Sequence, residues 1–230
     1  MDAVILDVGG VLLVPHAEAV NPALKPFGIR LDREQAERAH YGGVRALDAA
    51  DEATDLDGSA YLNGYVSAVG VASEDREQAL VRLREAFGAR SISVWRQKVL
   101  GSVEGLRRLE AAGIKLGIIS NADGSIEEQL RVNEICQVGA GLGVPVLAII
   151  DSTVVGVAKP AAEIFRHALD PIGVRPEEAL YVGDTVRYDI RGARNAGLKP
   201  IHFDPYDLCE TKADHAHIRT LAEVEKFAWH

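Results

Sequence analysis

Cysteine is scarce in this sequence, with Cys136 and Cys209 the only two among 230 residues. Two isolated thiols form neither a disulfide framework nor a familiar metal-ligand pattern, so we interpret both as structural or neutral. Long apolar runs are also missing, since no segment approaches the roughly 20 residues that a membrane span needs. Met1 and Asp2 lead into the first apolar segment without a basic region or a cleavage site. These absences predict a cytoplasmic protein that does not enter a membrane.

Positive charge is in deficit as well. The net charge is −9, the pI is near 5.3, and no run of lysine and arginine interrupts the acidic balance. An acidic protein is not attracted to nucleic acid or to anionic lipid, so we expect neither as a general partner. Apolar residues are plentiful at 47%. The chain is therefore globular and long enough for one large domain, or for a core with an accessory domain.

From residue 100 onward, helical patterns alternate with short apolar runs. Ser102 is an expected helix cap, Ser125 with Glu128 forms an expected capping box, and Pro160 is expected to begin a helix. The patterns predict helices over 102–112, 125–136, 160–169 and 187–196, and strands over 114–119, 144–150, 179–182 and 199–202. Such alternation is typical of a doubly wound parallel α/β sheet with right-handed crossovers.

Residues 15–94 carry helical patterns but no convincing strand. Asp32 and Gln35 predict the capped start of a helix that reaches about residue 40, and further helices are predicted over 56–69 and 73–87. The charged stretch 48–57 is interpreted as a solvated loop. We therefore predict two domains, namely a core of residues 1–14 and 95–230 and a helical cap of residues 15–94, inserted after the first strand and lying above the strand ends.

Polar residues follow four of the apolar runs in order: Asp7, then Ser120 with Asn121, then Lys159, then Asp184 with Asp189. In a doubly wound sheet these strand ends converge on one crevice. Three neighbouring carboxylates raise one another's pKa unless a cation neutralises them, and oxygen ligands without His or Cys suit Mg²⁺ best. A phosphate dianion could then bind, with Ser120 as a donor and Asp7 in line with phosphorus.

These segments resemble, in order, the four motifs of the haloacid dehalogenase superfamily, and the likeness covers essentially the whole chain. The segments are Val4 to Val11, Ile118-Ile119-Ser120-Asn121, Lys159-Pro160 and Gly183 to Asp189. The resemblance implies a Rossmann-like core with a cap of the superfamily's first type. It also implies that Asp7 is the nucleophile, that Ser120 and Asn121 belong to the substrate site, that Lys159 steadies nucleophile and phosphate, and that Mg²⁺ is held by Asp7, the Gly9 carbonyl and Asp184, with Asp189 supporting it.

Gly9 departs from the pattern of the superfamily's phosphatases, which usually carry a second Asp there to protonate the leaving alcohol and activate water. Glycine can do neither, and such assistance is worth about 10²–10⁴-fold. We expect the missing acid to slow the hydrolysis of alkyl phosphates more than that of aryl or acyl phosphates. His16, His40, Tyr41 and Asp48 are candidate substitutes, although packing or exposed positions are the better expectation for each. His215 and His217 are interpreted as part of a solvated loop.

The leading hypothesis is a Mg²⁺-dependent phosphohydrolase that acts on a small soluble phosphate ester through an aspartyl-phosphate on Asp7. One alternative is a 2-haloacid dehalogenase, for which Gly9 would be unremarkable but Asp184 and Asp189 would be unexpected. A phosphonate hydrolase would need a cap lysine, and the surroundings of Lys25 do not resemble that motif. The remaining alternative is a catalytically feeble relative that binds metal and phosphate for regulation. The substrate and the oligomeric state stay open.

Overall fold

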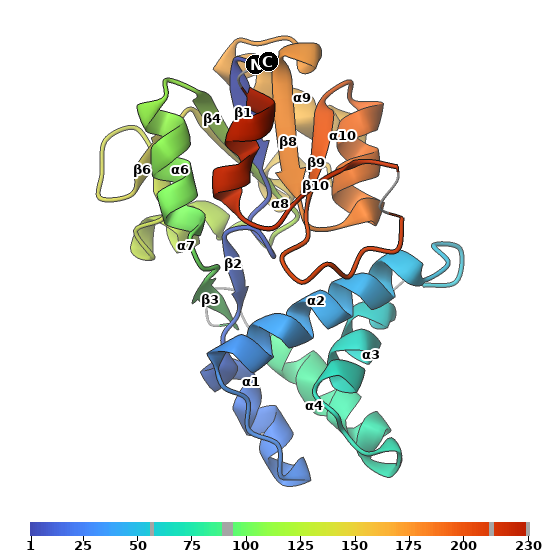
Figure 1. Cartoon of the computed structure of the whole chain (residues 1–230). Coiled ribbons are helices and arrows are strands. Elements are labelled where there is room, and N and C mark those ends of the chain that lie inside the picture. Colours follow the sequence, from blue (N-terminus) through green and yellow to red (C-terminus); the bar gives the residue numbers. More distant parts are fainter. Residues whose placement is uncertain (56–57, 89–93, 212–213, 229–230) are drawn as a thin grey trace. The chain divides into compact units, whose positions relative to one another are not determined.

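The structure is a computed structural model that describes residues 1–55, 58–88, 94–211 and 214–228. The chain divides into two compact units, one made of residues 1–12 and 98–230 and the other of residues 13–97 (Figure 1). The first unit is therefore built from two segments that are far apart in the sequence. None of the helices in the described ranges is both long and apolar enough to cross a bilayer.

A six-stranded parallel sheet forms the middle of the first unit, in the order β10-β9-β8-β1-β4-β7. Its strands are β1 (Ala3–Leu6), β4 (Lys115–Ser120), β7 (Ala148–Asp151), β8 (Ala179–Gly183), β9 (Lys199–Phe203) and β10 (Ala216–Ile218). All four residues of β1 are buried, as expected of a central strand covered on both faces. The predicted doubly wound parallel α/β fold is confirmed, although β10 was not expected.

Helices cover both faces of this sheet. Figure 1 shows α6 (Ser102–Ala111) and α11 (Glu225–Ala228) in front of it. On the opposite face, α9 (Ala162–Ile172) and α10 (Arg191–Asn195) share one buried cluster with the strands, in which Phe165 of α9 packs with Ile5 and Tyr181. This two-sided burial explains why the central strands are continuous apolar runs and not alternating ones.

The predicted strand over 144–150 is wrong as a single element. Residues Val144–Val146 form β6, which pairs only with β5 (Cys136–Val138) in a separate two-stranded sheet, and the main-sheet strand β7 begins at Ala148. Pro145 has no N–H to donate, and it lies in the short β5–β6 pair outside the main sheet. The helix predicted over 125–136 also ends early, at Val132 of α7 (Ile126–Val132), so Cys136 lies in a strand.

Three predicted helix starts are shifted or differently capped. The helix after Lys159 begins at Ala162, and Pro160 lies in the preceding turn. The side chain of Ser125 does not cap α7; the N–H groups of Gly124 and Ile126 donate instead to Asp151 Oδ2, at 2.9 and 3.3 Å. The helix predicted over 187–196 is divided into a π-turn, Val186–Ile190, and α10. Asp151, at the end of β7, also caps the short helix α8 (Ser152–Val155).

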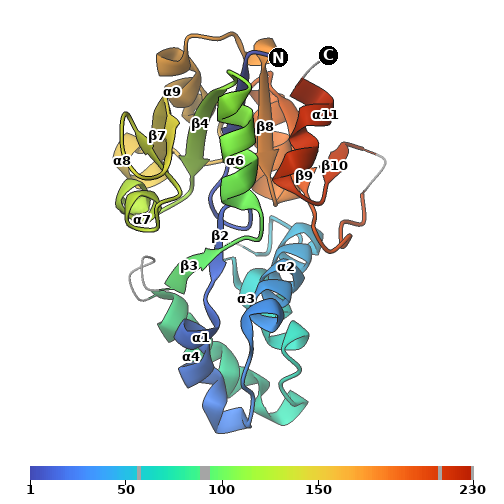
Figure 2. The same ribbon diagram turned by 60° about the vertical axis from the view of Figure 1, so that its left-hand side comes forward.

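The second unit is helical apart from two short strands. Its elements are β2 (Leu13–Pro15), α1 (Ala17–Leu24), a 3-10 turn Lys25–Phe27, α2 (Arg33–Ala49), α3 (Ser59–Ala68), a 3-10 turn Ser73–Asp75, α4 (Arg76–Gly88) and β3 (Trp95–Lys98), whose last residue belongs to the first unit (Figure 2). The predicted capping box of Asp32 and Gln35 is confirmed. The pairing of β2 with β3 and the helix α1 were not predicted.

The charged stretch 48–57 is only partly the solvated loop that was expected. Helix α2 continues to Ala49, past its predicted end near residue 40, and Asp55 is buried. Asp55 Oδ1 accepts the N–H of Ala60 at 3.0 Å and thereby caps the first turn of α3. Residues 56 and 57, where a helix was predicted to start, lie outside the described residues.

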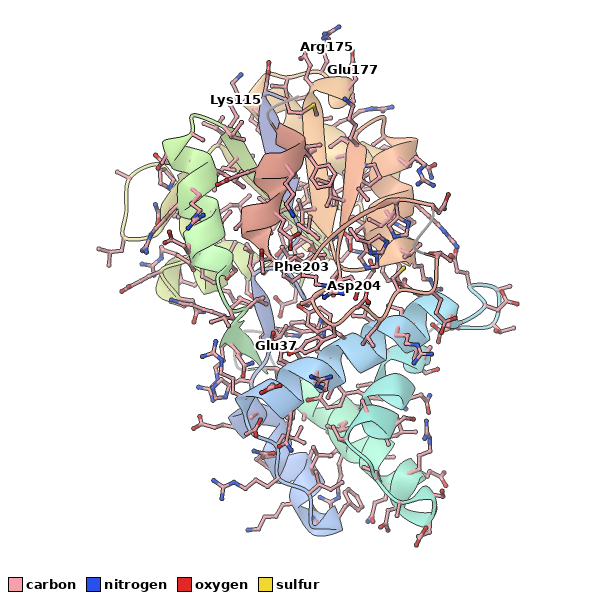
Figure 3. All side chains as sticks on the ribbon, in the orientation of Figure 1. Glu37, Lys115, Arg175, Glu177, Phe203 and Asp204 are labelled. Atoms are coloured by element: carbon pink, nitrogen blue, oxygen red, sulfur yellow. The ribbon has the colours of Figure 1, made fainter. Side chains whose placement is uncertain are left out.

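The two ends of the main sheet differ in composition. Lys115 and Arg175, labelled in Figure 3, mark the amino end of the strands, where Lys115 Nζ donates to the Ile172 carbonyl and Arg175 pairs with Glu177 on the surface. Asp204, labelled at the opposite end, follows β9. Several of the buried polar residues follow or end strands at this carboxyl end: Asp7, Ser120, Asp151, Asp184, Asp189, His202 and Asp204.

Candidate active site

The central strand β1 places Asp7 between the ends of its two neighbours. Leu6 is in register with Ile118 of β4 and with Val182 of β8. Asp7 therefore leaves the sheet just where Ser120 and Asp184 follow those strands. The strand order reverses at this point, since later strands add on both sides of β1. Ligand sites of open parallel sheets form at such reversals, outside the carboxyl ends of the strands.

Asp7 is tied to the sheet by its backbone, and its side chain is only slightly exposed. Its N–H donates to the Val182 carbonyl at 2.9 Å, and the residue is 7% exposed. The turn that follows requires glycine at position 10, where φ is 67°, a left-handed value that other residues rarely adopt. Gly9 is not among the residues with positive φ. The backbone would thus accept a side chain at position 9.

Lys159 pairs with two of the carboxylates. Its Nζ lies 2.8 Å from Asp7 Oδ1 and 2.7 Å from Asp189 Oδ1, and the side chain is almost wholly buried. Burial opposes the charge on Lys159, but Asp189 and Asp7 outweigh that effect and raise the pKa of Lys159. Asn121 fixes the backbone of Lys159 from both sides, because its Oδ1 accepts the Lys159 N–H at 2.8 Å and its Nδ2 donates to the Lys159 carbonyl at 3.0 Å.

Asp189 is saturated with protein donors. Its Oδ1 accepts from Lys159 and, at 2.9 Å, from the Tyr181 hydroxyl, while its Oδ2 accepts the N–H and hydroxyl of Thr185 at 3.0 and 2.6 Å. Burial raises the pKa of Asp189, but Lys159 and the Thr185 hydrogen bonds outweigh it, so the pKa is lowered. A Cβ on Gly183 would lie 2.3 Å from the Asp189 Cβ, so only glycine leaves room for this carboxylate.

Tyr181 is a member of the site that the sequence did not indicate. Its hydroxyl accepts from Lys159 Nζ at 3.0 Å and donates to Asp189, and the ring is completely buried. Burial, followed by the charges of Asp189 and Asp7, raises the pKa of Tyr181 well above its usual value, so the hydroxyl stays protonated. A tyrosine in an otherwise aliphatic strand was the available signal, because a buried tyrosine hydroxyl usually finds a partner.

We call Asp7, Asp184, Asp189 and Lys159 the acid site. One carboxylate oxygen from each of its aspartates lies within 4.8 Å of the others. Burial raises the pKa of Asp7 to about 7; Lys159 opposes the rise, and Asp189 and Asp184 add to it. Lys159 alone therefore does not balance the three acids, and a divalent cation with a preference for oxygen would fit this donor set.

The other predicted site residues are placed as follows. Ser120 ends β4 and is buried, next to Asp151 across the β4–β7 pair. His16 caps α1 through its Nδ1, which accepts the Glu18 N–H at 3.1 Å. His40 is buried with its Nδ1 2.9 Å from the Tyr61 hydroxyl, and burial lowers the pKa of His40 to about 3. Tyr41 is also buried. The packing role expected for His40 thus has a clear basis.

The prediction that His215 and His217 belong to a solvated loop is wrong. Both are half-buried, and they lie close to His202 and Cys209. His202 Nε2 is 2.8 Å from the carbonyl of Asp184, so this group directly adjoins the acid site. The treatment of Cys209 as a neutral, isolated thiol also needs correction, because its sulfur is 3.7 Å from His215 Nε2.

Comparison with known proteins gives consistent relatives. Residues 1–197 match the profile of the haloacid dehalogenase-like hydrolases, which confirms the family resemblance of the four motifs. The chain is 37% identical over 92 residues to a phosphoserine phosphatase of Thermus thermophilus, an alignment covering 40% of this chain and 34% of that protein. It is 32% identical over 149 residues to a glyceraldehyde 3-phosphate phosphatase of Pyrococcus abyssi, covering 62% and 51%.

Solved structures share the fold. A magnesium-bound hydrolase of the same superfamily from Bacillus subtilis has a TM-score of 0.65 at 20% identity, with 99% of this chain and 98% of that chain covered. A dehalogenase with an intermediate complex has a TM-score of 0.60 at 18% identity, covering 99% and 96%. The chain spans about half or less of the length of the two phosphatases above, so their substrates do not transfer directly.

Proposed function

We propose that this chain, which belongs to the haloacid dehalogenase-like hydrolases, is a Mg²⁺-dependent phosphohydrolase of a small phosphate ester with Asp7 as its nucleophile. The observation that carries the proposal is the buried acid site, in which Lys159 touches both Asp7 and Asp189 and leaves negative charge unbalanced. The relatives named as phosphatases support the same reaction class.

The reaction would run in two displacements at phosphorus. An Asp7 carboxylate oxygen attacks phosphorus, and the bond to the ester oxygen breaks, so the substrate's alcohol leaves as its oxyanion and takes a proton from water. Water then attacks the phosphorus of the aspartyl-phosphate and loses a proton, which releases inorganic phosphate and restores Asp7. Lys159 favours the ionised, nucleophilic form of Asp7, and the Ser120 hydroxyl would donate a hydrogen bond to a phosphoryl oxygen.

Asp7, Asp184 and the Gly9 carbonyl would hold Mg²⁺. The donors fit, since all are oxygens, and the charge of Lys159 alone faces the three clustered carboxylates. When bound, the ion would supply positive charge to the phosphoryl group. Asp189, whose two oxygens already accept four bonds, would serve mainly by holding Lys159 and Thr185 in place. Asn121 would likewise position Lys159 and not contact substrate.

Gly9 limits the chemistry that this site can perform. No side chain at position 9 can protonate the leaving group, so substrates whose leaving oxyanions are stable should react best. The same feature motivates a second candidate, a relative that binds Mg²⁺ and phosphate without appreciable turnover. A 2-haloacid dehalogenase is less well supported, because the reaction at carbon gives no role to Asp184 in the three-acid cluster.

The test is steady-state hydrolysis of an aryl phosphate, with Mg²⁺ and with EDTA. We expect Mg²⁺-dependent turnover that falls by at least about 10³-fold in Asp7→Asn. Asp170→Asn, an exposed change on α9 of the same unit, is the matched control and should behave as the unmodified protein. If the folded protein binds Mg²⁺ but turns over no phosphate ester, the binding relative is correct and the hydrolase is not.

A further inference from the structure

A second cluster of ligand-type side chains lies beside the acid site, at the paired strands β9 and β10. His202 of β9 is in register with His217 of β10, and the segment joining the two strands supplies Cys209 and His215. One ligand atom from each of the four residues lies within 4.8 Å of the others. We call these four residues the histidine cluster. Its members are three imidazoles and one thiol, with no carboxylate among them.

Two separations between ligand atoms of different residues are close to the edges of a tetrahedral site. His202 Nδ1 is 3.0 Å from His215 Nε2, and Cys209 Sγ is 3.7 Å from the same nitrogen. Metal bonds of about 2.0–2.1 Å to nitrogen and about 2.3 Å to sulfur at tetrahedral angles place two nitrogens roughly 3.4 Å apart and nitrogen and sulfur roughly 3.6 Å apart. Only small shifts would bring these atoms onto one ion.

The outer nitrogen of the His202 ring is held as it is in metal ligands. His202 Nε2 lies 2.8 Å from the carbonyl of Asp184, which can only accept, so Nε2 carries the proton and Nδ1 presents its lone pair to the cluster. Asp204 Oδ2 is 3.6 Å from His217 Nδ1, an ion-pair separation that is too long for a hydrogen bond. Ligating histidines usually donate their second N–H to a carbonyl or carboxylate, as His202 does.

Asp204 also places the thiol. Its Oδ1 accepts the N–H of Leu208 at 2.8 Å and its Oδ2 accepts the N–H of Cys209 at 3.1 Å. One buried carboxylate thus contacts both the ring of His217 and the backbone of Cys209.

The three rings lie against one another, which favours the neutral form that binds metal. Their centroids are 4.5–5.1 Å apart, so protonation of one ring disfavours protonation of the next. Burial and the neighbouring histidines lower the pKa of His215 to about 4, and burial lowers the pKa of His202. The charged groups near the cluster are Asp204, which follows β9, and Asp189 beside His202, with Asp214 and Arg194 beside His215.

We propose that His202, Cys209, His215 and His217 form a structural site for a divalent transition metal of the zinc class. Three imidazoles and a thiolate suit Zn²⁺ and do not suit Mg²⁺, and four protein ligands close the coordination shell. The ion would join the segment after β9 to the sheet edge and fix His202, the ring that holds the Asp184 carbonyl. This site is separate from the proposed hydrolase chemistry.

The experiment uses tag-free full-length protein, purified with a non-thiol reductant, stripped by chelation and restored with Mg²⁺. Zn²⁺ binding and the absorption spectrum with Co²⁺ are then measured. We expect one Zn²⁺ per chain and a thiolate-to-Co²⁺ charge-transfer band. Cys209→Ser should abolish the band and weaken binding by at least about 10–100-fold, as should His215→Asn for binding. Cys136→Ser and His167→Asn are matched controls outside the cluster and should keep both.

A third variant guards against loss of folding. Asp204→Asn retains all four ligands and should weaken Zn²⁺ binding by about tenfold while the charge-transfer band persists. Equal Zn²⁺ affinity in the unmodified protein, Cys209→Ser and His215→Asn, all folded by near-ultraviolet circular dichroism, would overturn the site and leave a hydrogen-bonded stack of histidines. None of these readouts depends on turnover. The proposed hydrolase function can therefore be refuted while the metal site is supported, and the metal site can be refuted while the hydrolase function is supported.

Discussion

The acid site and the histidine cluster lie at the carboxyl end of one sheet and meet at a single residue. Asp184 contributes its side chain to the acid site, while its carbonyl is bound by His202 of the histidine cluster. One site is built from oxygen atoms at the ends of central strands, and the other from nitrogen and sulfur at the sheet's edge. The same fold therefore presents hard and soft ligands a short distance apart.

The two sites differ in how much charge their buried side chains carry. The acid site keeps three carboxylates and balances them only partly with Lys159, which leaves negative charge that an added cation would neutralise. The histidine cluster has no carboxylate among its four members, and burial lowers the pKa of both His202 and His215, which disfavours charge on those rings. The metal that each site would prefer therefore depends on the charge of its ligands as well as on their geometry. Each substitution below should disturb the acid site and leave Zn²⁺ binding by the proposed histidine-cluster site unchanged when that binding is measured separately.

Gly9→Asp should have the largest effect. A carboxylic acid at position 9 could protonate the leaving oxygen, so turnover of alkyl phosphates should rise by about 10²–10⁴-fold and that of aryl phosphates far less. The backbone at position 9 is compatible with the change, since φ there is not positive. Steady-state kinetics with a matched pair of alkyl and aryl phosphates measures the difference. Equal gains on both would show that another group already protonates the leaving oxygen.

Lys159→Met should destabilise the protein by about 3–5 kcal/mol, because two buried carboxylates lose their common partner. Urea unfolding in EDTA measures the loss, and added Mg²⁺ should recover part of it by replacing the missing charge. Lys226→Met, which removes an exposed ion pair with Glu223, is the control and should cost less than about 1 kcal/mol. A cost as small as the control's would mean that Asp7 and Asp189 are not both ionised.

The stability of the metal-free protein should depend on pH through the titration of Asp7. Its pKa is raised from an ordinary value of 3.8 to about 7, so the unfolded chain gives up this proton first and stability falls as pH rises between these values. From pH 5 to pH 8 the free energy of unfolding should drop by about 2–3 kcal/mol on this account. Asp7→Asn should remove that part of the slope. If the slope is the same in Asp7→Asn, groups other than Asp7 cause the pH dependence.

Gly183→Ala should cost about 1–3 kcal/mol and reduce turnover. The added methyl group would overlap the Asp189 Cβ at 2.3 Å and push the carboxylate that holds Lys159. Gly88→Ala is the control, because its Cβ would meet nothing within 4 Å, and it should stay within about 0.5 kcal/mol. Thermal unfolding and aryl phosphate hydrolysis test the pair. Equal behaviour of the two variants would argue against the tight fit at Asp189.

Tyr181→Phe should have the smallest effect, a loss of about 1–2 kcal/mol. It removes a hydroxyl that accepts from Lys159 and donates to Asp189, but those two groups remain paired with each other. Chemical unfolding measures the change, and turnover should fall only modestly. A loss as large as that of Lys159→Met would show that the hydroxyl, and not the ion pair, holds the acid site together.

Much of the fold was open to prediction because its signals are local. Apolar runs located β1, β4, β8 and β9, and the Asp32–Gln35 spacing located the start of α2. The failures occurred where distant contacts override local preference. The sequence predicts that Ser125 caps α7, but its side chain does not. At the start of this helix, Asp151 from the end of β7 accepts the N–H groups of Gly124 and Ile126. Strand β10 has only three residues, too few for a periodic pattern to show.

The amino-acid sequence by itself determined the family and the order of the four motifs, because strand–helix alternation and polar residues at strand ends are written along the chain. Only the tertiary structure decided the rest. Tyr181 reaches Lys159 and Asp189 because β8 is buried against α9, and His202 meets His217 because β9 pairs with β10. Such neighbours are set by strand register and packing, which join residues that no local spacing relates.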